Sequence, residues 1–176
     1  MAIREILKYP HPVLRQKAEP VTLFDDALKG LVADMAETMY AAPGVGLAAN
    51  QIGVLQQVVV IDITGSKDEP KQLITLINPR IVKGEGADVD EEGCLSVVDL
   101  TANVQRFTRI WVEAQSVDGD PVEFVAEEYF ARVVQHELDH LHGHLFIDWI
   151  SSLKRALYKK KRKKQLQAEQ HDEATA

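Results

Sequence analysis

Five consecutive residues, His136-Glu137-Leu138-Asp139-His140, form an H-E-x-x-H pattern. In a helix, residues four apart lie one turn apart on the same face, so the two imidazoles can bind one metal ion. A glutamate beside two such histidines can take a proton from a water molecule that the metal activates. The pattern therefore predicts a metal-dependent hydrolytic site on a helix. Because so short a motif also arises by chance, its neighbours decide the interpretation.

A catalytic metal site usually has three protein ligands and one open position, so a third ligand must lie outside this motif. His144 is two residues short of the third histidine in a longer form of the motif. Glu169 and Glu173 lie in a basic C-terminal segment, which is a poor source of core ligands. Cys94, the one cysteine, then remains. A thiolate and two neutral imidazoles suit a tetrahedral divalent ion with water as the fourth ligand.

The motif must be positioned by a helix, and the sequence predicts one from about Ala126 to Leu141. Glutamates 127 and 128 suit its first turn, and Gly143 suits its end. Its apolar residues recur at helical spacing: Phe130, Val133, Val134, Leu138 and Leu141. This helix is therefore expected to pack inside the domain.

Two further helices are predicted from their apolar periodicity. The first begins near Asp25, which suits an N-cap, and ends near residue 42. Its apolar stripe consists of Leu28, Leu31, Val32, Met35 and Met39. The second runs from about Ser152 to Gln170, with Leu153, Leu157 and Leu166 facing inward.

Runs of branched residues predict strands at 58–63 and 73–77, and Asn78-Pro79 is expected to end the second. Residues 109–114 and 121–125 flank Asp118-Gly119-Asp120, which indicates a hairpin. Several strands and a few helices without regular β-α-β alternation predict an α+β fold.

The composition is that of a globular protein of one domain, with 176 residues, 45% hydrophobic and 27% charged. No apolar run is long enough to span a bilayer, and the charged N-terminus does not resemble a signal peptide. We therefore expect a cytoplasmic protein with no membrane partner. Residues 151–176 carry a net charge of about +5 and include six consecutive cations at 159–164, whereas the rest of the chain is acidic.

Three motifs, taken in order, resemble the signature motifs of the peptide deformylases. They are Gly44-Val45-Gly46-Leu47-Ala48-Ala49-Asn50-Gln51, Glu92-Gly93-Cys94-Leu95-Ser96 and Gln135-His136-Glu137-Leu138-Asp139-His140. The similarity extends to about residue 155. The resemblance implies antiparallel or mixed β-sheets packed around a central helix that bears the H-E-x-x-H motif, followed by a C-terminal helix. We divide the chain into a catalytic domain, 1–150, and a basic helical extension of it, 151–176.

The resemblance also implies the reaction, which is hydrolysis of the N-formyl group from the initiator methionine of new polypeptides, with release of formate. Cys94, His136 and His140 would hold one divalent metal ion. Glu137 would act as general base and then as general acid.

Further roles follow from the same resemblance. The backbone N–H of Leu95 and the amide of Gln51 would stabilise the oxyanion. Val45 and Gly46 would lie along the substrate backbone as an added strand. Tyr129 and Val133 share the helix face of His136, which makes them candidates for the wall of the methionine pocket, although core packing explains them almost as well.

The ligand chemistry and the family resemblance predict different metal ions. Ligand softness favours zinc, whereas the resemblance implies ferrous iron as the native ion, with nickel, cobalt or zinc as replacements. The chain also departs from the family pattern. Val98 stands where the cysteine motif usually has proline, and an arginine that some members carry a few residues later is absent from Asp99-Leu100-Thr101-Ala102-Asn103. Contacts to the substrate beyond the methionine are therefore left open.

The basic residues 159–164 allow two interpretations, a solvated helix face or a surface that binds ribosomal RNA. The expected partners are formylmethionyl nascent peptides and, on the second interpretation, the ribosome, but not DNA. Two other functions remain as alternatives. One is a different small metallopeptidase or amidohydrolase. The other is a non-enzymatic ribosome-associated protein with a structural metal held by a fourth protein ligand.

Overall fold

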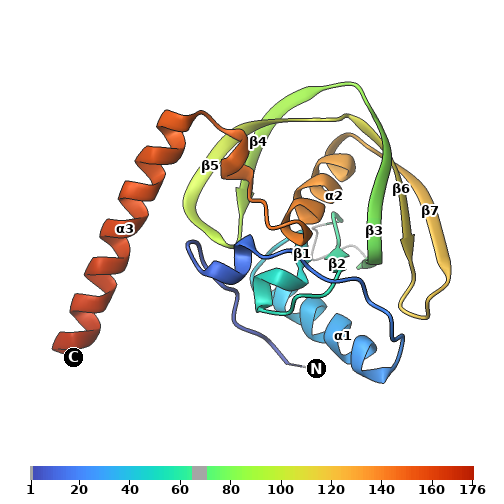
Figure 1. Cartoon of the computed structure of the whole chain (residues 1–176), viewed down its shortest axis with the longest axis horizontal. Coiled ribbons are helices and arrows are strands. Elements are labelled where there is room, and N and C mark those ends of the chain that lie inside the picture. Colours follow the sequence, from blue (N-terminus) through green and yellow to red (C-terminus); the bar gives the residue numbers. More distant parts are fainter. Residues whose placement is uncertain (1, 65–70) are drawn as a thin grey trace.

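The computed structural model describes residues 2–64 and 71–176 of the chain (Figure 1). The described strands are β1 (Gly46–Ala48), β2 (Val58–Ile61), β3 (Ile74–Glu85), β4 (Asp88–Cys94), β5 (Val97–Arg106), β6 (Arg109–Gln115) and β7 (Pro121–Glu127). They form a five-stranded antiparallel sheet in the order β1-β2-β3-β6-β7, and a separate antiparallel hairpin of β4 and β5.

The α-helices among the described residues are α1 (Asp26–Ala41), α2 (Glu128–Leu141) and α3 (Ser152–Thr175). Short 3-10 helices occupy Pro12–Arg15, Ala49–Ile52 and Phe146–Trp149 in the same part of the chain. The arrangement confirms the predicted α+β fold with a central motif-bearing helix and a C-terminal helix. None of the described helices combines the length and apolar character needed to cross a membrane.

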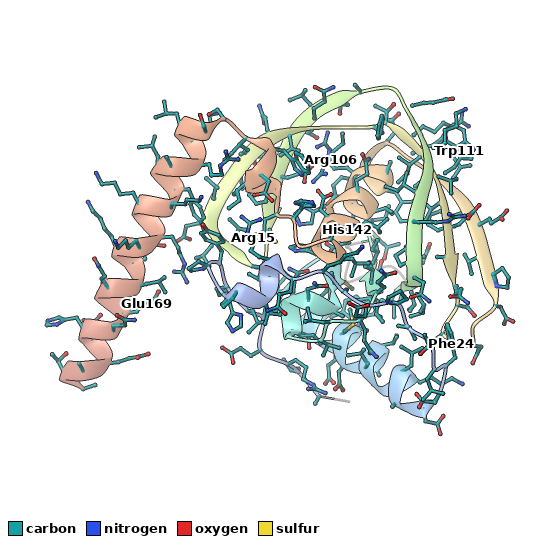
Figure 2. The ribbon with its side chains drawn as sticks, viewed as in Figure 1. Arg15, Phe24, Arg106, Trp111, His142 and Glu169 are labelled. Atoms are coloured by element: carbon teal, nitrogen blue, oxygen red, sulfur yellow. The ribbon has the colours of Figure 1, made fainter. Side chains whose placement is uncertain are left out.

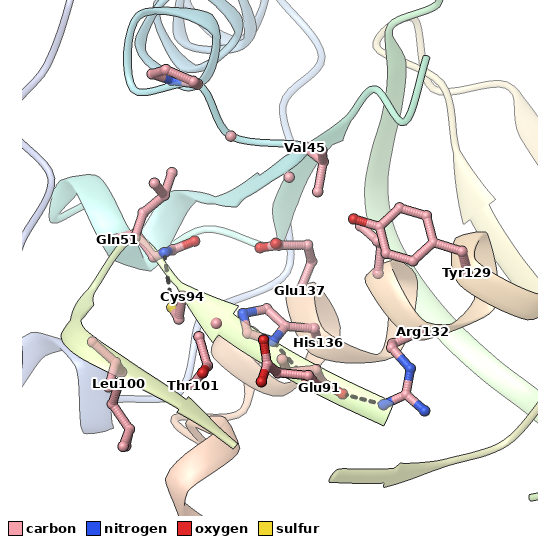
Figure 3. Close-up of a pocket in the computed structure, with 18 of the residues that line it drawn as sticks. Val45, Gln51, Glu91, Cys94, Leu100, Thr101, Tyr129, Arg132, His136 and Glu137 are labelled. Atoms are coloured by element: carbon pink, nitrogen blue, oxygen red, sulfur yellow. Dashed lines mark hydrogen bonds and ion pairs between the residues drawn. The ribbon is translucent and has the colours of Figure 1, made fainter. Parts of the chain in front are cut away.

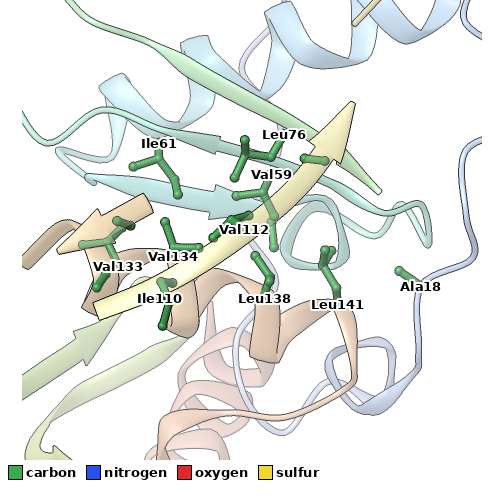
Figure 4. Packing of buried hydrophobic residues seen from close by; sticks show 14 residues of the cluster. Ala18, Val59, Ile61, Leu76, Ile110, Val112, Val133, Val134, Leu138 and Leu141 are labelled. Carbon is green, nitrogen blue, oxygen red and sulfur yellow. The ribbon is translucent and has the colours of Figure 1, made fainter. Parts of the chain in front are cut away.

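Helix α2 lies in the middle of the molecule, between the large sheet and the β4–β5 hairpin (Figure 1). Its apolar residues Val134, Leu138 and Leu141 pack against the sheet, as their helical spacing predicts (Figure 4). The helix ends where Gly143 adopts a φ of +77°. A Cβ atom there would lie 2.5 Å from the backbone oxygen of Arg15, so this position requires glycine both for its conformation and for space.

Helix α1 covers the opposite face of the large sheet. Its predicted N-cap is confirmed, because the Asp25 carboxylate accepts the Leu28 N–H at 3.0 Å. Strand β2 is a continuous run of apolar residues because both of its faces are buried. Val58 and Val60 pack in the cluster with α1, whereas Val59 and Ile61 pack in the cluster with α2. A strand covered on both faces has no polar alternation.

The strand predicted at residues 73–77 does not end at Asn78-Pro79. Strand β3 continues to Glu85, with a shift of register between Ile77 and Arg80. Pro79 falls inside this irregularity, where its missing N–H does not interrupt a regular ladder. Asn78 has a φ of +51°, and its side chain bonds to the backbone of Val21. The predicted hairpin around residues 118–120 is confirmed by the pairing of β6 with β7.

The inward face of α3 differs from the predicted one. Leu153 and Leu157 are 68% and 59% exposed, whereas Tyr158 is only 3% exposed. The Tyr158 hydroxyl donates to the Val98 oxygen at 3.0 Å, and the Arg162 guanidinium donates to the Tyr9 oxygen at 2.8 Å. An aromatic ring and a long polar side chain attach this helix. The prediction was therefore wrong for Leu153 and Leu157, whereas Leu166 is half-buried, one turn after Arg162.

An extended N-terminal segment, residues 7–9, connects several parts of the fold. The Leu7 N–H donates to the backbone carbonyl oxygen of Gln51, and the Tyr9 N–H donates to that of Ser96, both at 2.7 Å. Arg162 of α3 holds the carbonyl of Tyr9. The 3-10 helix that carries Gln51 and the turn that carries Ser96 are therefore fixed to one another through this segment.

Candidate metal centre

The two histidines and the cysteine singled out from the sequence lie together in the structure. Cys94 ends β4, and His136 and His140 lie one turn apart on α2. Their candidate ligand atoms are all within 4.8 Å of one another, and Sγ of Cys94 is 3.4 Å from Nε2 of His140. Among the described residues, no fourth cysteine, histidine or carboxylate belongs to this group.

The alternative ligands lie elsewhere. His144 is largely exposed and faces Asp148, with 3.5 Å between Nδ1 and a carboxylate oxygen. His142 bonds through Nδ1 to the Leu138 carbonyl. Glu169 lies on α3, well away from α2, and is paired with Arg162 (Figure 2).

The chemistry of these donors fits a divalent metal ion. One soft sulfur and two imidazole nitrogens form a set that binds zinc or iron, with one position left for water. Two buried polar atoms at the site, Oε2 of Glu137 and Nδ1 of His140, have no hydrogen-bond partner among the residues that the structure describes. Burial raises the pKa of Glu137 to about 7. A carboxylate with this pKa can both accept and return a proton near neutral pH.

The orientation of His136 is set by Glu92, whose role sequence reasoning missed. Nδ1 of His136 is 2.9 Å from Oε1 of Glu92. Glu92 is buried and also accepts hydrogen bonds from Arg106 and from Arg132. Burial alone would raise the pKa of Glu92, but the hydrogen bonds from Arg106 and His136 outweigh it and lower the pKa to about 2. Glu92 is therefore ionised at neutral pH, and its carboxylate contacts Nδ1 of His136.

The charge network extends from Arg106 to the second half of the H-E-x-x-H motif. Nη1 of Arg106 lies 2.6 Å from Oδ2 of Asp139, which also accepts from Nε1 of Trp149 at 2.9 Å. Glu92 and Asp139 lie inside the motifs quoted above, so their place in the sequence could have indicated a role at the site. Arg106 carries no local pattern, because its role depends on pairing with residues 14 and 33 positions away.

Gln51 lies in the 3-10 helix Ala49–Ile52 and is almost completely buried. Its Oε1 accepts the Ala48 N–H at 2.9 Å, which fixes the amide. Its Nε2 then points toward Cys94, at 3.7 Å from Sγ and 3.1 Å from Oγ of Ser96 (Figure 3). Leu95 follows Cys94 directly, and its carbonyl oxygen accepts from the Lys8 ammonium.

These residues open onto a pocket of about 570 Å³. One wall is the segment from Pro43 to Gly46, and the other is the β4–β5 hairpin (Figure 3). Tyr129 and Val133 of α2 line the same pocket, as does Val45. A Cβ atom at Gly46 would lie 2.5 Å from Oε1 of Glu137, so the glycine allows β1 to pass directly over the carboxylate.

Comparison with known proteins gives one consistent family. The sequence model of the family described as polypeptide deformylase matches residues 3–156. A peptide deformylase of Desulfotalea psychrophila is 51% identical over 164 residues, which cover 93% of this chain and 97% of that protein. A peptide deformylase of Pseudomonas aeruginosa is 47% identical over 166 residues, covering 94% and 97%. The crystal structure of a peptide deformylase from Legionella pneumophila superimposes with a TM-score of 0.86 at 46% identity, covering 95% and 98%.

Proposed function

The chain belongs to the peptide deformylase family, and we propose that Cys94, His136 and His140 form its catalytic centre. As a member of this family, it is a metal-dependent hydrolase that removes the N-formyl group from newly synthesised polypeptides. The observation that carries this proposal is the approach of their ligand atoms to within 4.8 Å beside the buried Glu137 carboxylate. A metal ion bound there supplies Lewis acidity, which makes water a nucleophile near neutral pH.

Glu137 moves the proton in this proposal. Its carboxylate accepts a proton as a water oxygen attacks the formyl carbon, and it returns that proton to the amine nitrogen as the C–N bond breaks. The products are formate and a free amino terminus. The pKa of about 7 that burial gives Glu137 suits both transfers.

The negative charge that develops on the formyl oxygen needs donors that are already in place. Nε2 of Gln51 is directed toward Cys94 because Oε1 of the same amide is held by Ala48. We assign the second donor to the backbone N–H of Leu95. The contact between Lys8 and the Leu95 carbonyl restrains the backbone on the other side of that residue.

The substrate backbone is proposed to lie along β1. This strand is at one end of the order β1-β2-β3-β6-β7, so its outer edge has no neighbouring strand in the sheet. An extended peptide can add to such an edge by backbone hydrogen bonds, with Val45 and Gly46 as its contacts. Tyr129 and Val133 line the same pocket and are proposed as walls for the methionine side chain.

We propose one ferrous ion per chain as the native cofactor, on the strength of the family resemblance, with zinc, nickel or cobalt able to replace it. The donor set of one thiolate and two imidazoles accommodates each of these ions. Iron beside a thiolate would make the enzyme sensitive to oxygen.

We further propose that α3 brings the enzyme to the ribosome. Its lysines 159, 160, 163 and 164 are exposed, whereas Tyr158 and Arg162 attach the helix to the domain. The face that does not touch the domain is therefore densely cationic. Such a surface binds the phosphates of RNA with a strong dependence on salt.

The catalytic proposal is tested by measuring formate release from formyl-Met-Ala-Ser with the wild type and with Glu137→Gln. We expect the variant to keep its metal and its fold and to lose at least about a hundredfold in kcat/KM. Formate release at the wild-type rate would contradict the role of Glu137. Hydrolysis of the unformylated peptide Met-Ala-Ser at a comparable rate would instead indicate a small peptidase.

A further inference from the structure

The wall of the pocket formed by the β4–β5 hairpin carries an acidic side chain that the proposed chemistry does not use. Glu91 is exposed and lines the pocket that also contains Glu137 and Cys94. No cation among the described residues pairs with its carboxylate. Its neighbour Glu92 lines the same pocket, but its carboxylate is buried and paired with Arg106 and Arg132.

The register of the hairpin shows which residues share the face of Glu91. Glu91 is opposite Asn103, and Gly93 is opposite Thr101. Because side chains alternate along a strand, Glu91 and Thr101 lie on the same face as diagonal neighbours. Figure 3 shows both side chains on the pocket side of the hairpin. Gly93 lies between them without a side chain, so this face is open to a ligand.

The other charges near this face do not compensate Glu91. Arg132 lines the pocket, but its guanidinium donates to Glu92, to the Val104 carbonyl and to the Asp88 carbonyl. Asp99, which also lines the pocket, is itself an anion, and its hydrogen-bond partner Gln165 is neutral. The carboxylate of Glu91 is thus left as an unpaired negative charge on the wall of the pocket.

We propose that Glu91 is a specificity-determining residue that favours substrates with lysine or arginine among the first two residues after the formyl-methionine. This inference rests on the proposed function of the pocket. A peptide whose formyl group lies at Glu137, and whose backbone runs between Pro43–Gly46 and the hairpin, passes the face that carries Glu91 and Thr101. A cationic side chain there meets an unpaired carboxylate, and an anionic one meets repulsion.

The test compares two pairs of peptides with the metal-loaded enzyme: formyl-Met-Lys-Ser against formyl-Met-Glu-Ser, and formyl-Met-Ala-Lys against formyl-Met-Ala-Glu. In at least one pair we expect kcat/KM to be about three- to tenfold higher for the lysine peptide at low ionic strength, because such exposed charge pairs are weak and screened by salt. Since one preparation hydrolyses both peptides, the ratio does not depend on the fraction of active enzyme.

Two variants assign the preference to its source. Glu91→Gln should bring the ratio close to one, and Thr101→Arg, which places a cation diagonal to Glu91, should bring it to one or below. Glu123→Gln on β7, at the opposite edge of the sheet from β1, removes the same charge at an exposed site and should leave the ratio unchanged. Equal rates for both peptides of each pair in the wild type, or a ratio that persists in Glu91→Gln, would overturn the inference. Absence of formate from all four peptides would instead reject the proposed function.

Discussion

Nδ1 of His136 lies 2.9 Å from Oε1 of Glu92, a carboxylate that the guanidinium groups of Arg106 and Arg132 also hold. The contact occupies one nitrogen of the ring and leaves Nε2 free to bind the proposed metal ion. The orientation of the His136 ring is therefore set by charged groups of the chain itself. A second carboxylate, Asp139, shares Arg106 and extends the same network to the end of the motif helix.

The first prediction concerns Glu92→Gln. The amide keeps the shape of the side chain but removes the charge that two buried arginines share, so we expect the free energy of unfolding to fall by about 3–5 kcal/mol. Metal affinity should fall about 10- to 100-fold, because the histidine loses its orienting anion. Urea unfolding and competition with a chelator measure the two effects. Asp90→Asn, an exposed change two residues earlier, is the control. Unchanged metal affinity in Glu92→Gln would contradict the prediction.

A second prediction compares two glycines. Gly46→Ala places a methyl group 2.5 Å from Oε1 of Glu137, so we expect the carboxylate to be displaced and kcat to fall by at least about tenfold while the protein remains folded. Gly30→Ala in α1 meets no atom within 4 Å and should raise the free energy of unfolding by about 0.5–1 kcal/mol. Formate release and thermal unfolding distinguish these results. Full activity of Gly46→Ala would show that the close passage of β1 has no catalytic consequence.

The third prediction addresses Gln51→Glu. Oxygen replaces the amide donor, while the acceptor for the Ala48 N–H is retained. We expect kcat to fall about 10²- to 10³-fold, the usual cost of losing one oxyanion donor, with a smaller change in KM. The exposed change Gln56→Glu alters the net charge equally and serves as the comparison. A variant that lost only substrate affinity, with kcat preserved, would place Gln51 in binding rather than in transition-state stabilisation.

The fourth prediction concerns the metal. If iron is native, protein purified without oxygen should contain about one iron per chain and should lose activity in air as the iron–thiolate site is oxidised. Protein reloaded with nickel or zinc is the control and should keep a constant activity in air. Metal analysis together with formate release over time measures both. Equal activity of the anaerobic preparation before and after prolonged aeration would count against iron.

The fifth prediction separates the two faces of α3. Truncation before this helix would remove Tyr158 from a hydrophobic cluster, so it is a poor test of ribosome binding. Replacing lysines 159, 160, 163 and 164 by glutamine leaves Tyr158 and Arg162 in place. We expect the wild type to co-sediment with ribosomes in a strongly salt-dependent manner and the variant to do so weakly. Circular dichroism should show that the helix remains. Equal co-sedimentation of the two proteins would reject the proposed docking face.

The parts of the fold that could be predicted are those with local signals. The Asp25 cap, the apolar face of α2 and the turn at 118–120 each depend on residues close in sequence, and the structure confirms them. The β4–β5 hairpin was not predicted. Its strands are rich in acidic and polar residues, and much of its stability depends on groups far along the chain, such as Arg132, which bonds to the carbonyls of Asp88 and Val104. The alternation of apolar and polar residues along a strand cannot reveal a distant hydrogen-bond donor such as Arg132.

The candidate site shows the same limit. The residues proposed to carry the chemistry lie in short motifs, so Cys94 and His136 could be selected by type and spacing. Arg106 could not, since it matters only because folding places it between Glu92 and Asp139. The attachment of α3 was misjudged for a related reason. Leucine spacing indicates which face of a helix is apolar, whereas the bond from the Tyr158 hydroxyl to the Val98 carbonyl decides which face meets the domain.

The bond between the Arg162 guanidinium and the Tyr9 carbonyl joins residues 153 positions apart. Tyr9 in turn pairs with Ser96, two residues after the cysteine. During synthesis, this bond cannot form until Arg162 has emerged from the ribosome. Contacts of such long sequence separation also form late and slowly in folding. A growing chain therefore lacks the connection between α3 and the segment beside Ser96 until residue 162 is available to form it.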